Sequence, residues 1–433
     1  YTCVTVYNPT ADEVEVWLRW GNPFGSVAAV IYFNAVPALG SRTLRRLVGA
    51  VCDNYFDDFA FLPLTMLNGL TIYGAAAASQ RAGKMVMEAL GYPYSEEKHV
   101  PSAPANVFCG VTNDFVRLPW EGIIMVYLSQ QRREAIAALC EDAAQSCPPS
   151  LAATIRGKAW WATAWAPGTP GRACLQPISA RADYPLSLET IGQLPSAVSA
   201  HLHRALMFLR DIMRAMPPRV IKLDEAERKP ILIWSDAMYD HSSTGGGWLI
   251  WIRYGKPDVK DKLLVALGQT PADVLDLLVK GKKTYIGQLE VVWAVSPIMT
   301  VPDELRNQQA IHFIDNKGAM AGLLKGYSRP VDTAMLVNAF HAKNVTVQMD
   351  TWFEYVRSKA NISDLPSRGA LIELLAIMQR MSLLSITSII PASMPDIRSW
   401  HSAASAWTAR GNISAEALGV SPLATLRTRW AHP

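Results

Sequence analysis

Two carboxylates stand side by side in an apolar and aromatic stretch of the chain, residues 51–63. Asp57 and Asp58 follow Tyr55 and Phe56 there. Adjacent carboxylates resist burial unless a cation lies beside them. Neighbouring side chains of a strand point to opposite faces, so both carboxylates can serve one site only at a tight hairpin turn. The sequence predicts such a hairpin with a divalent metal ion, and an acidic tip exposed to water is the alternative.

Four further carboxylates lie in apolar contexts in the second half of the chain. Asp236 ends an expected apolar strand, and a loop that contains the glycines 245–247 is expected to follow it. Glu290 falls in the first turn of an expected helix that follows a strand. Asp315 directly follows another apolar strand, and Asp364 belongs to a later polar segment. Any one of these residues alone is more simply explained as a surface charge.

The ordered set of four predicts metal chemistry. Strand ends and the first turns of adjoining helices meet at one edge of a mixed sheet, so residues far apart in sequence can converge there. Carboxylate oxygens are the hard ligands that Mg²⁺ prefers. Two such ions about 3.5–4 Å apart activate an attacking water and stabilise the leaving oxygen. The expected cofactor is therefore Mg²⁺ or Mn²⁺.

Residues 230–370 resemble the ribonuclease H domains of retroelements. The strand that ends in Asp236, the glycine-bearing loop and the new strand from Trp248 are similar to the opening of such domains, and residues 355–368 strongly resemble their terminal motif. The resemblance implies hydrolysis of the RNA strand of an RNA–DNA hybrid, with Asp236, Glu290, Asp315 and Asp364 as the catalytic, metal-binding residues. Where many members carry a histidine before the last acidic residue, this chain has Arg357, Lys359 and Asn361.

The first part of the chain resembles reverse transcriptases of gypsy-type and DIRS-type retroelements. Three motifs occur in the order typical of the palm of that family, with their nucleic-acid-binding positions at Pro23, Phe24 and Gly25, then Tyr55, then Lys98. Arg156 and Lys158 belong to a segment that resembles a helix of the thumb that follows the palm. The resemblance gives Asp57 and Asp58 a role in binding the metal ions of polymerisation. It implies an RNA template, a DNA primer and deoxynucleotide triphosphates as partners. Trp160, Trp161 and Trp165 either stack on bases or pack between helices, and packing is favoured.

One metal-binding aspartate of the polymerase family has no counterpart. The resemblance places it on a strand before the hairpin expected over residues 2–17, which is before Tyr1. We therefore expect the sequence to be a fragment of a longer retrotransposon polyprotein, and we expect no primer extension by this chain. Asp12, Glu13 and Glu15 are expected to be solvated charges of that hairpin.

The expected fold class is α/β and α+β multidomain. The domains are a partial reverse-transcriptase palm over 1–120, a helical thumb and connection over 121–229, a ribonuclease H-like mixed sheet with helices over 230–370 and a tail of unknown role over 371–433. Apolar spacing predicts helices over 121–144, from 151 onward and over 194–216. Residues 371–390 are interrupted by charges and predict an amphipathic helix rather than a membrane span.

Composition is that of a globular chain with ample apolar residues, 50% of 433. The six cysteines are dispersed without metal-binding pairs, which favours a reducing compartment, so the expected location is intracellular, in cytoplasm or nucleus. The net charge is +4, and basic residues exceed acidic ones over 121–230, where a phosphate backbone or only solvent would face them. The sequence leaves open the oligomeric state and an alternative function, a degenerate or non-catalytic nucleic-acid-binding protein that retains the fold.

Overall fold

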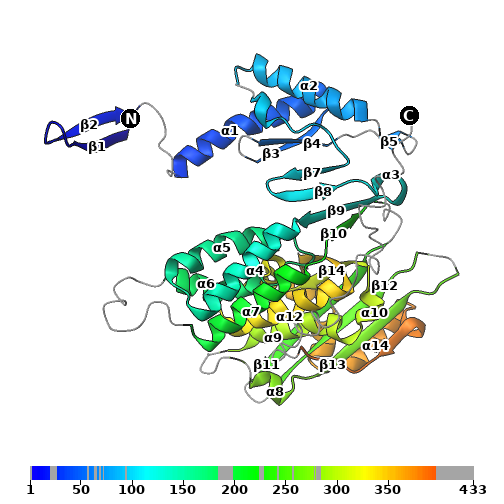
Figure 1. Cartoon of the computed structure of the whole chain (residues 1–433). Coiled ribbons are helices and arrows are strands. Elements are labelled where there is room, and N and C mark those ends of the chain that lie inside the picture. Colours follow the sequence, from blue (N-terminus) through cyan, green and yellow to red (C-terminus); the bar gives the residue numbers. More distant parts are fainter. Residues whose placement is uncertain are drawn as a thin grey trace. The chain divides into compact units, whose positions relative to one another are not determined.

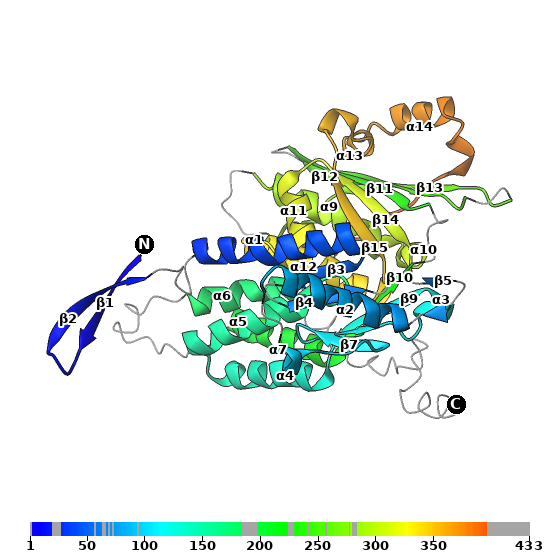
Figure 2. The ribbon, with the colours of Figure 1, turned by 90° about the horizontal axis from the view of Figure 1, so that it is seen from above.

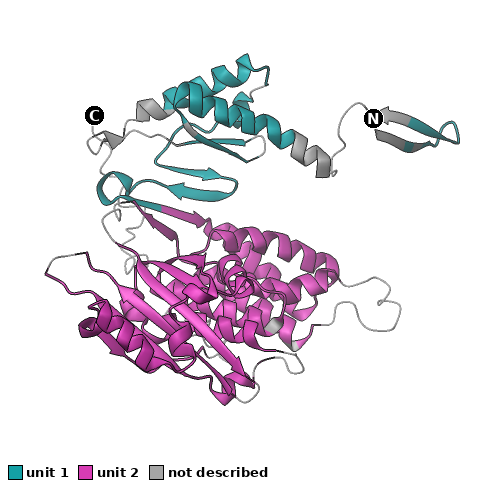
Figure 3. Cartoon of the chain, turned by 180° about the vertical axis from the view of Figure 1, so that it is seen from behind, with its two compact units in different colours: residues 1–124 teal, residues 125–433 magenta. Residues whose placement is uncertain are grey.

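The structure is a computed structural model of the 433-residue chain. It describes residues 2–19, 27–55, 58–62, 66–67, 70–71, 73–92, 95–183, 198–223, 229–240, 243–255, 258–276, 278 and 284–395. The chain is a mixed α/β protein with two compact units, Tyr1–Ile124 and Met125–Pro433 (Figures 1 and 3).

The first unit contains short antiparallel hairpins and two long helices. Its strands are β1 (Thr2–Asn8), β2 (Glu13–Arg19), β3 (Val51–Tyr55), β4 (Asp58–Leu62), β5 (Met66–Leu67), β6 (Leu70–Thr71), β7 (Ala105–Phe108) and β8 (Val111–Asp114). Its helices are α1 (Val27–Thr43), a π-helical turn η1 (Leu44–Val48), α2 (Tyr73–Ala89), a 3₁₀ turn η2 (Glu96–Lys98) and α3 (Leu118–Glu121). The hairpins predicted over 2–17 and around Tyr55 are both present, because β1 pairs with β2 and β3 pairs with β4.

One strand crosses the boundary between the two units along the chain, and a group of helices follows it in the second unit. The elements are β9 (Ile123–Leu128), α4 (Gln130–Gln145), α5 (Pro149–Ala164), η3 (Arg172–Cys174), α6 (Leu175–Ala182), α7 (Ala200–Ala215) and β10 (Arg219–Lys222). The helix predicted over 121–144 is wrong in its first part, since 123–128 is strand. A short apolar run fits either element, and Ser129 starts α4 by accepting a hydrogen bond from the Arg132 N–H at 3.3 Å. The helices predicted from 151 and within 194–216 correspond to α5 and α7.

A six-stranded mixed sheet follows. Its order is β15 (Asp350–Tyr355), β14 (Gln309–Ile314), β11 (Ile231–Asp240), β12 (Ser243–Ile252), β13 (Lys262–Gln269) and β16 (Thr387–Ile389). β11, β12 and β13 form an antiparallel meander, whereas β14 and β15 run parallel to β11 on its other side. The accompanying helices are α8 (Ala272–Leu275), α9 (Ile286–Thr300), α10 (Pro302–Leu305), α11 (Lys317–Lys325), α12 (Val331–Val347), η6 (Ser358–Ala360), α13 (Asp364–Ser367), α14 (Leu371–Arg380) and η7 (Leu384–Ile386).

Helices cover both faces of this sheet. Figure 2 shows α9, α11 and α12 on one side, with α13 and α14 on the other. Along β12 the side chains alternate accordingly: Trp248 and Ile250 join the core under α9, whereas Leu249 packs with Leu374 and Met378 of α14. The sheet continues beyond residue 370 because β16 pairs in parallel with β13.

The glycines 245–247 do not form the predicted loop. They lie inside β12, where Gly247 pairs with Asp236 and Gly246 with Ala237. The prediction failed because a glycine run is typical of turns, whereas here the missing side chains make room for neighbouring helices. Among the described helices, none is long and apolar enough to cross a membrane.

Candidate metal centre

Strand register brings Asp236 and Asp315 together. In the parallel pair of β11 and β14, Ser235 lies opposite Ile314, so the next residue of each strand is an aspartate. β14 ends at Ile314, and Asn316 starts α11 by accepting hydrogen bonds from the Gly318 and Ala319 N–H groups at 3.0 and 3.1 Å. Asp315 thus occupies the single position between strand and helix cap. Asp236 was predicted to end its strand, but β11 runs on to Asp240, so Asp236 lies instead beside the end of β14.

Glu290 is supplied by α9, the buried helix of the unit. Every residue from Gln288 to Ile298 is buried, and Glu290 is the only charged residue of the helix. A helix that is apolar on all sides belongs in a core, so its single carboxylate stands out. The structure corrects two details of the prediction. Glu290 is the fifth residue of α9 rather than in its first turn, and the residues described just before α9, Thr284 and Tyr285, are not in a strand.

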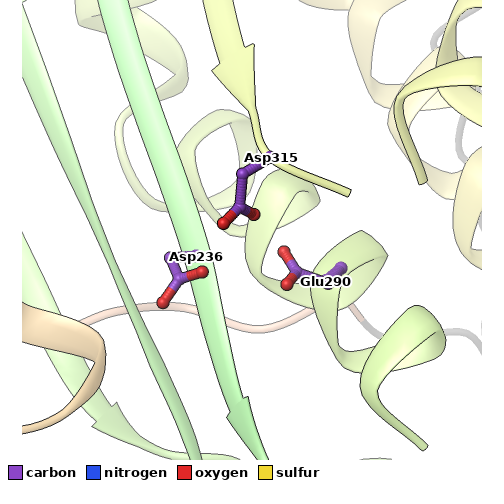
Figure 4. Close-up of side chains that lie close together, drawn as sticks. All are labelled: Asp236, Glu290 and Asp315. Atoms are coloured by element: carbon purple, nitrogen blue, oxygen red, sulfur yellow. The ribbon is translucent and has the colours of Figure 1, made fainter. Parts of the chain in front are cut away.

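Three carboxylates form a group that can hold a metal ion. One ligand oxygen from each of Asp236, Glu290 and Asp315 lies within 4.8 Å of the others. Figure 4 shows their carboxyl groups gathered between β11, the end of β14 and α9. Glu290 Oε2 and Asp315 Oδ1 are buried and accept no hydrogen bond from the described residues. Buried carboxylate oxygens without donors fit a hard divalent cation, because the cation would satisfy them and offset their mutual repulsion.

The pKa values of two of these groups are raised. Burial raises the pKa of Asp236 to about 6; the hydroxyl of Ser367 opposes this shift, and the charges of Asp315 and Asp364 add to it. Burial, then the charges of Asp236 and Asp315, raise the pKa of Glu290 to about 9. Without a cation the group therefore disfavours full ionisation at neutral pH, which is typical of a site built to bind one.

We expect Glu290→Gln to stabilise the metal-free protein increasingly as pH rises. The folded-state pKa of Glu290, about 9, exceeds its ordinary 4.5, so the native state binds the extra proton between these values and wild-type stability falls as pH rises through that window. Glutamine is neutral throughout. The stability difference should be near zero below pH 4.5 and on the order of 3 kcal/mol at pH 7. Urea unfolding of both proteins in EDTA measures it.

The control variant is Asp258→Asn, which removes a carboxylate at an exposed position. A Glu290→Gln difference that stays constant between pH 5 and 8 would contradict the environment assigned to Glu290. Added Mg²⁺ should reduce the difference, since a cation stabilises the ionised wild-type carboxylate.

The glycine run of β12 allows helices to approach the site from both faces. A Cβ on Gly246 would lie 2.4 Å from atoms of the Trp293 ring in α9. A Cβ on Gly247 would lie 2.9 Å from Pro366 Cβ and from the Ser367 backbone nitrogen in α13. These close approaches set how near the two helices lie to β12. The helix α9 carries Glu290, and the helix α13 carries Asp364.

Asp364 lies at the rim of the site rather than in the group of three. Its Oδ1 accepts a hydrogen bond from Arg368 Nε at 2.7 Å, and its charge is close enough to raise the pKa of Asp236. Asn361, considered above in place of a histidine, is buried, and its Nδ2 donates to the Ser235 carbonyl at 3.1 Å. Asn361 therefore anchors the terminal motif to β11. Ser367 was not singled out from the sequence, yet it donates a hydrogen bond to Asp236 Oδ2.

The predicted polymerase residues lie in the first unit. Tyr55 pairs with Asp58 across β3 and β4, and both are exposed. Burial, and then the charge of Asp58, raise the pKa of the Cys109 thiol in the β7–β8 turn, so this turn lies near Asp58. Lys98 ends the exposed turn η2. The predicted residues outside the described part of the chain are Asp57, Pro23, Phe24 and Gly25.

The candidate nucleic-acid contacts of α5 have different surroundings. Arg156 pairs with Asp183 at 2.8 Å, and Lys158 is exposed. The Arg172 guanidinium lies 4.6 Å from the ring centroid of Trp160, which is 47% exposed. Trp161 and Trp165, in contrast, pack against each other edge to face with centroids 5.5 Å apart. Trp160 thus has a half-exposed ring beside a cation.

Comparison of the chain with known protein families gave no match, and comparison with curated proteins gave none either.

Proposed function

We propose that the chain is part of a retroelement polyprotein and that its second unit is a metal-dependent ribonuclease H, which cuts the RNA strand of RNA–DNA hybrids. The carboxylate group of Asp236, Glu290 and Asp315 carries this proposal. These residues come from separate sequence motifs, and one carboxylate oxygen of each lies within 4.8 Å of the others. The order of the strands also supports the proposal. The strand β14 lies parallel to β11, on the side away from the meander, and this pairing places Asp315 beside Asp236.

In this proposal Asp236, Glu290 and Asp315 hold Mg²⁺ or Mn²⁺, and Asp364 contributes from the rim. The bound cation supplies Lewis-acid chemistry, activating water and stabilising the leaving oxygen. The protein residues hold the carboxylates in place: β11 and β14 fix two of them by register, and the buried helix α9 fixes the third. The Asp364–Arg368 pair places a cationic side chain beside the acidic group, where it can meet a phosphate of the substrate.

The first unit is proposed to belong to the polymerase part of the same polyprotein. β3 and β4 form an antiparallel pair in which Tyr55 lies opposite Asp58, and this pairing supports the proposed role of Asp58. The exposed position of Asp58 fits a site that faces substrate, and it equally fits a solvated hairpin tip.

Cleavage of matched labelled substrates by the full chain tests the nuclease function. With Mg²⁺ or Mn²⁺ we expect cleavage of RNA in an RNA–DNA hybrid, little cleavage of single-stranded RNA and none of the DNA strand, because recognition should depend on duplex shape and 2′-hydroxyls. EDTA should abolish cleavage. Folded protein that binds the hybrid but leaves its RNA intact with either metal would instead favour the non-catalytic nucleic-acid-binding alternative.

A further inference from the structure

Hydrogen bonds join the segment around the short helix α13 to two consecutive residues of β11, Ser235 and Asp236. Asn361, just before the helix, donates to the carbonyl of Ser235, and Ser367, at its end, donates to the carboxylate of Asp236. Asn361 is itself fixed, because its Oδ1 accepts from Ser363 Oγ at 2.6 Å. The contact from Ser367 therefore comes from a backbone that is held in place independently of the carboxylate.

A carboxylate needs such a contact to present one fixed oxygen to a metal ion. Rotation about χ2 of aspartate is broad, with no sharp minimum to hold the carboxyl plane. Figure 4 shows one oxygen of Asp236 directed toward Glu290 and Asp315 and the other directed away. A hydroxyl that donates to Oδ2 restricts this rotation. It also satisfies one oxygen in a place where water has little access, since Asp236 and Ser367 are only 5% and 4% exposed.

We propose that Ser367 is a positioning residue for Asp236: its hydroxyl fixes the carboxylate so that the group of three can bind a divalent cation. The inference rests on the proposed metal-dependent function and adds a residue to it. Gly247 is part of the same arrangement, because a side chain at 247 would push Pro366 and Ser367 away from β12. The carbonyl of Asp364, 3.1 Å from Ser367 Oγ, is a second acceptor for the single proton of this hydroxyl.

The experiment measures Mn²⁺ binding to the full chain by electron paramagnetic resonance of the free ion. Ser367→Ala should raise the Mn²⁺ dissociation constant by about 10- to 100-fold, the loss typical of removing a hydrogen bond to a metal ligand. The matched control is Ser296→Ala. Ser296 is a fully buried serine, but its hydroxyl donates to the Ser393 carbonyl at 2.8 Å and not to a carboxylate of the site. Ser296→Ala should leave the Mn²⁺ dissociation constant close to that of the wild type even if it lowers the melting temperature.

The outcomes separate this inference from the proposed function. Wild-type protein that binds Mn²⁺ together with a Ser367→Ala protein that binds it equally well overturns the positioning role and leaves the metal site standing. Wild-type protein that binds no Mn²⁺ overturns both. If Ser367→Ala does not fold, Ser367→Cys tests the positioning role instead, because its thiol has a similar shape but is a weak hydrogen-bond donor. Folded Ser367→Cys should bind Mn²⁺ more weakly, and unchanged binding would reject the inference.

Discussion

Asp236→Asn and Glu290→Gln should each reduce cleavage of the RNA strand of a hybrid by at least about 100-fold, because a lost metal ligand removes several kcal/mol of transition-state stabilisation. The fold should survive both changes, since each removes a charge from a crowded, buried acidic group. Initial rates with saturating Mg²⁺, measured on a labelled hybrid, give the effect. Hybrid affinity, measured in parallel without metal, should change little.

Asp258→Asn is the matched control for this prediction. It makes the same chemical change at an exposed position and should cleave like the wild type. Equal rates for the wild type and both site variants would contradict the catalytic role of these carboxylates. Cleavage would then come from another site or from a contaminating nuclease.

Gly246→Ala should unfold the second unit at markedly lower urea concentration. The new Cβ would lie 2.4 Å from the Trp293 ring, which is fully buried and donates its Nε1–H to Thr270 Oγ1 at 3.1 Å. The ring cannot move without breaking that hydrogen bond and the packing of α9, so the expected loss is about 3 kcal/mol or more. Mn²⁺ binding should weaken as well, because α9 carries Glu290.

Gly268 offers a control in the neighbouring strand. It lies directly opposite Gly246 in the β12–β13 pair, yet its Cβ would be 4.0 Å from Trp293, an ordinary contact. Gly268→Ala should therefore leave stability nearly unchanged or raise it slightly. If the two variants unfold at the same urea concentration, the close approach of Trp293 to Gly246 is not what limits the packing.

The carboxylates of the site could be predicted from the sequence because each carries a local signal. Asp315 follows an apolar strand directly, and Glu290 is the only charge in a long apolar segment. The mixed α/β class follows from the same alternation of apolar strands and helices. The polymerase assignment of Asp57 has only its sequence context, and it stays a prediction.

Other features depend on contacts between distant residues and gave no local signal. The apolar run 123–128 fits a helix or a strand. It forms a strand because it pairs with neighbouring strands in a sheet. The run 245–247 is typical of a turn, and only the approach of Trp293 and Pro366 explains its place inside β12. The sequence around Ser367 gives no sign of its role, which depends on the contact of α13 with Asp236 of β11.

The strand β16 has a consequence for how the second unit avoids self-association. Its three residues pair with Leu263, Leu264 and Val265 of β13, a run of buried apolar residues. Without this cover, β13 would present unpaired backbone N–H and C=O groups along an apolar edge, which is a template for adding a strand from another molecule. Residues 387–389 thus cover the edge of β13 and protect it from edge-to-edge aggregation. A fragment that ends at residue 370 would leave that edge uncovered.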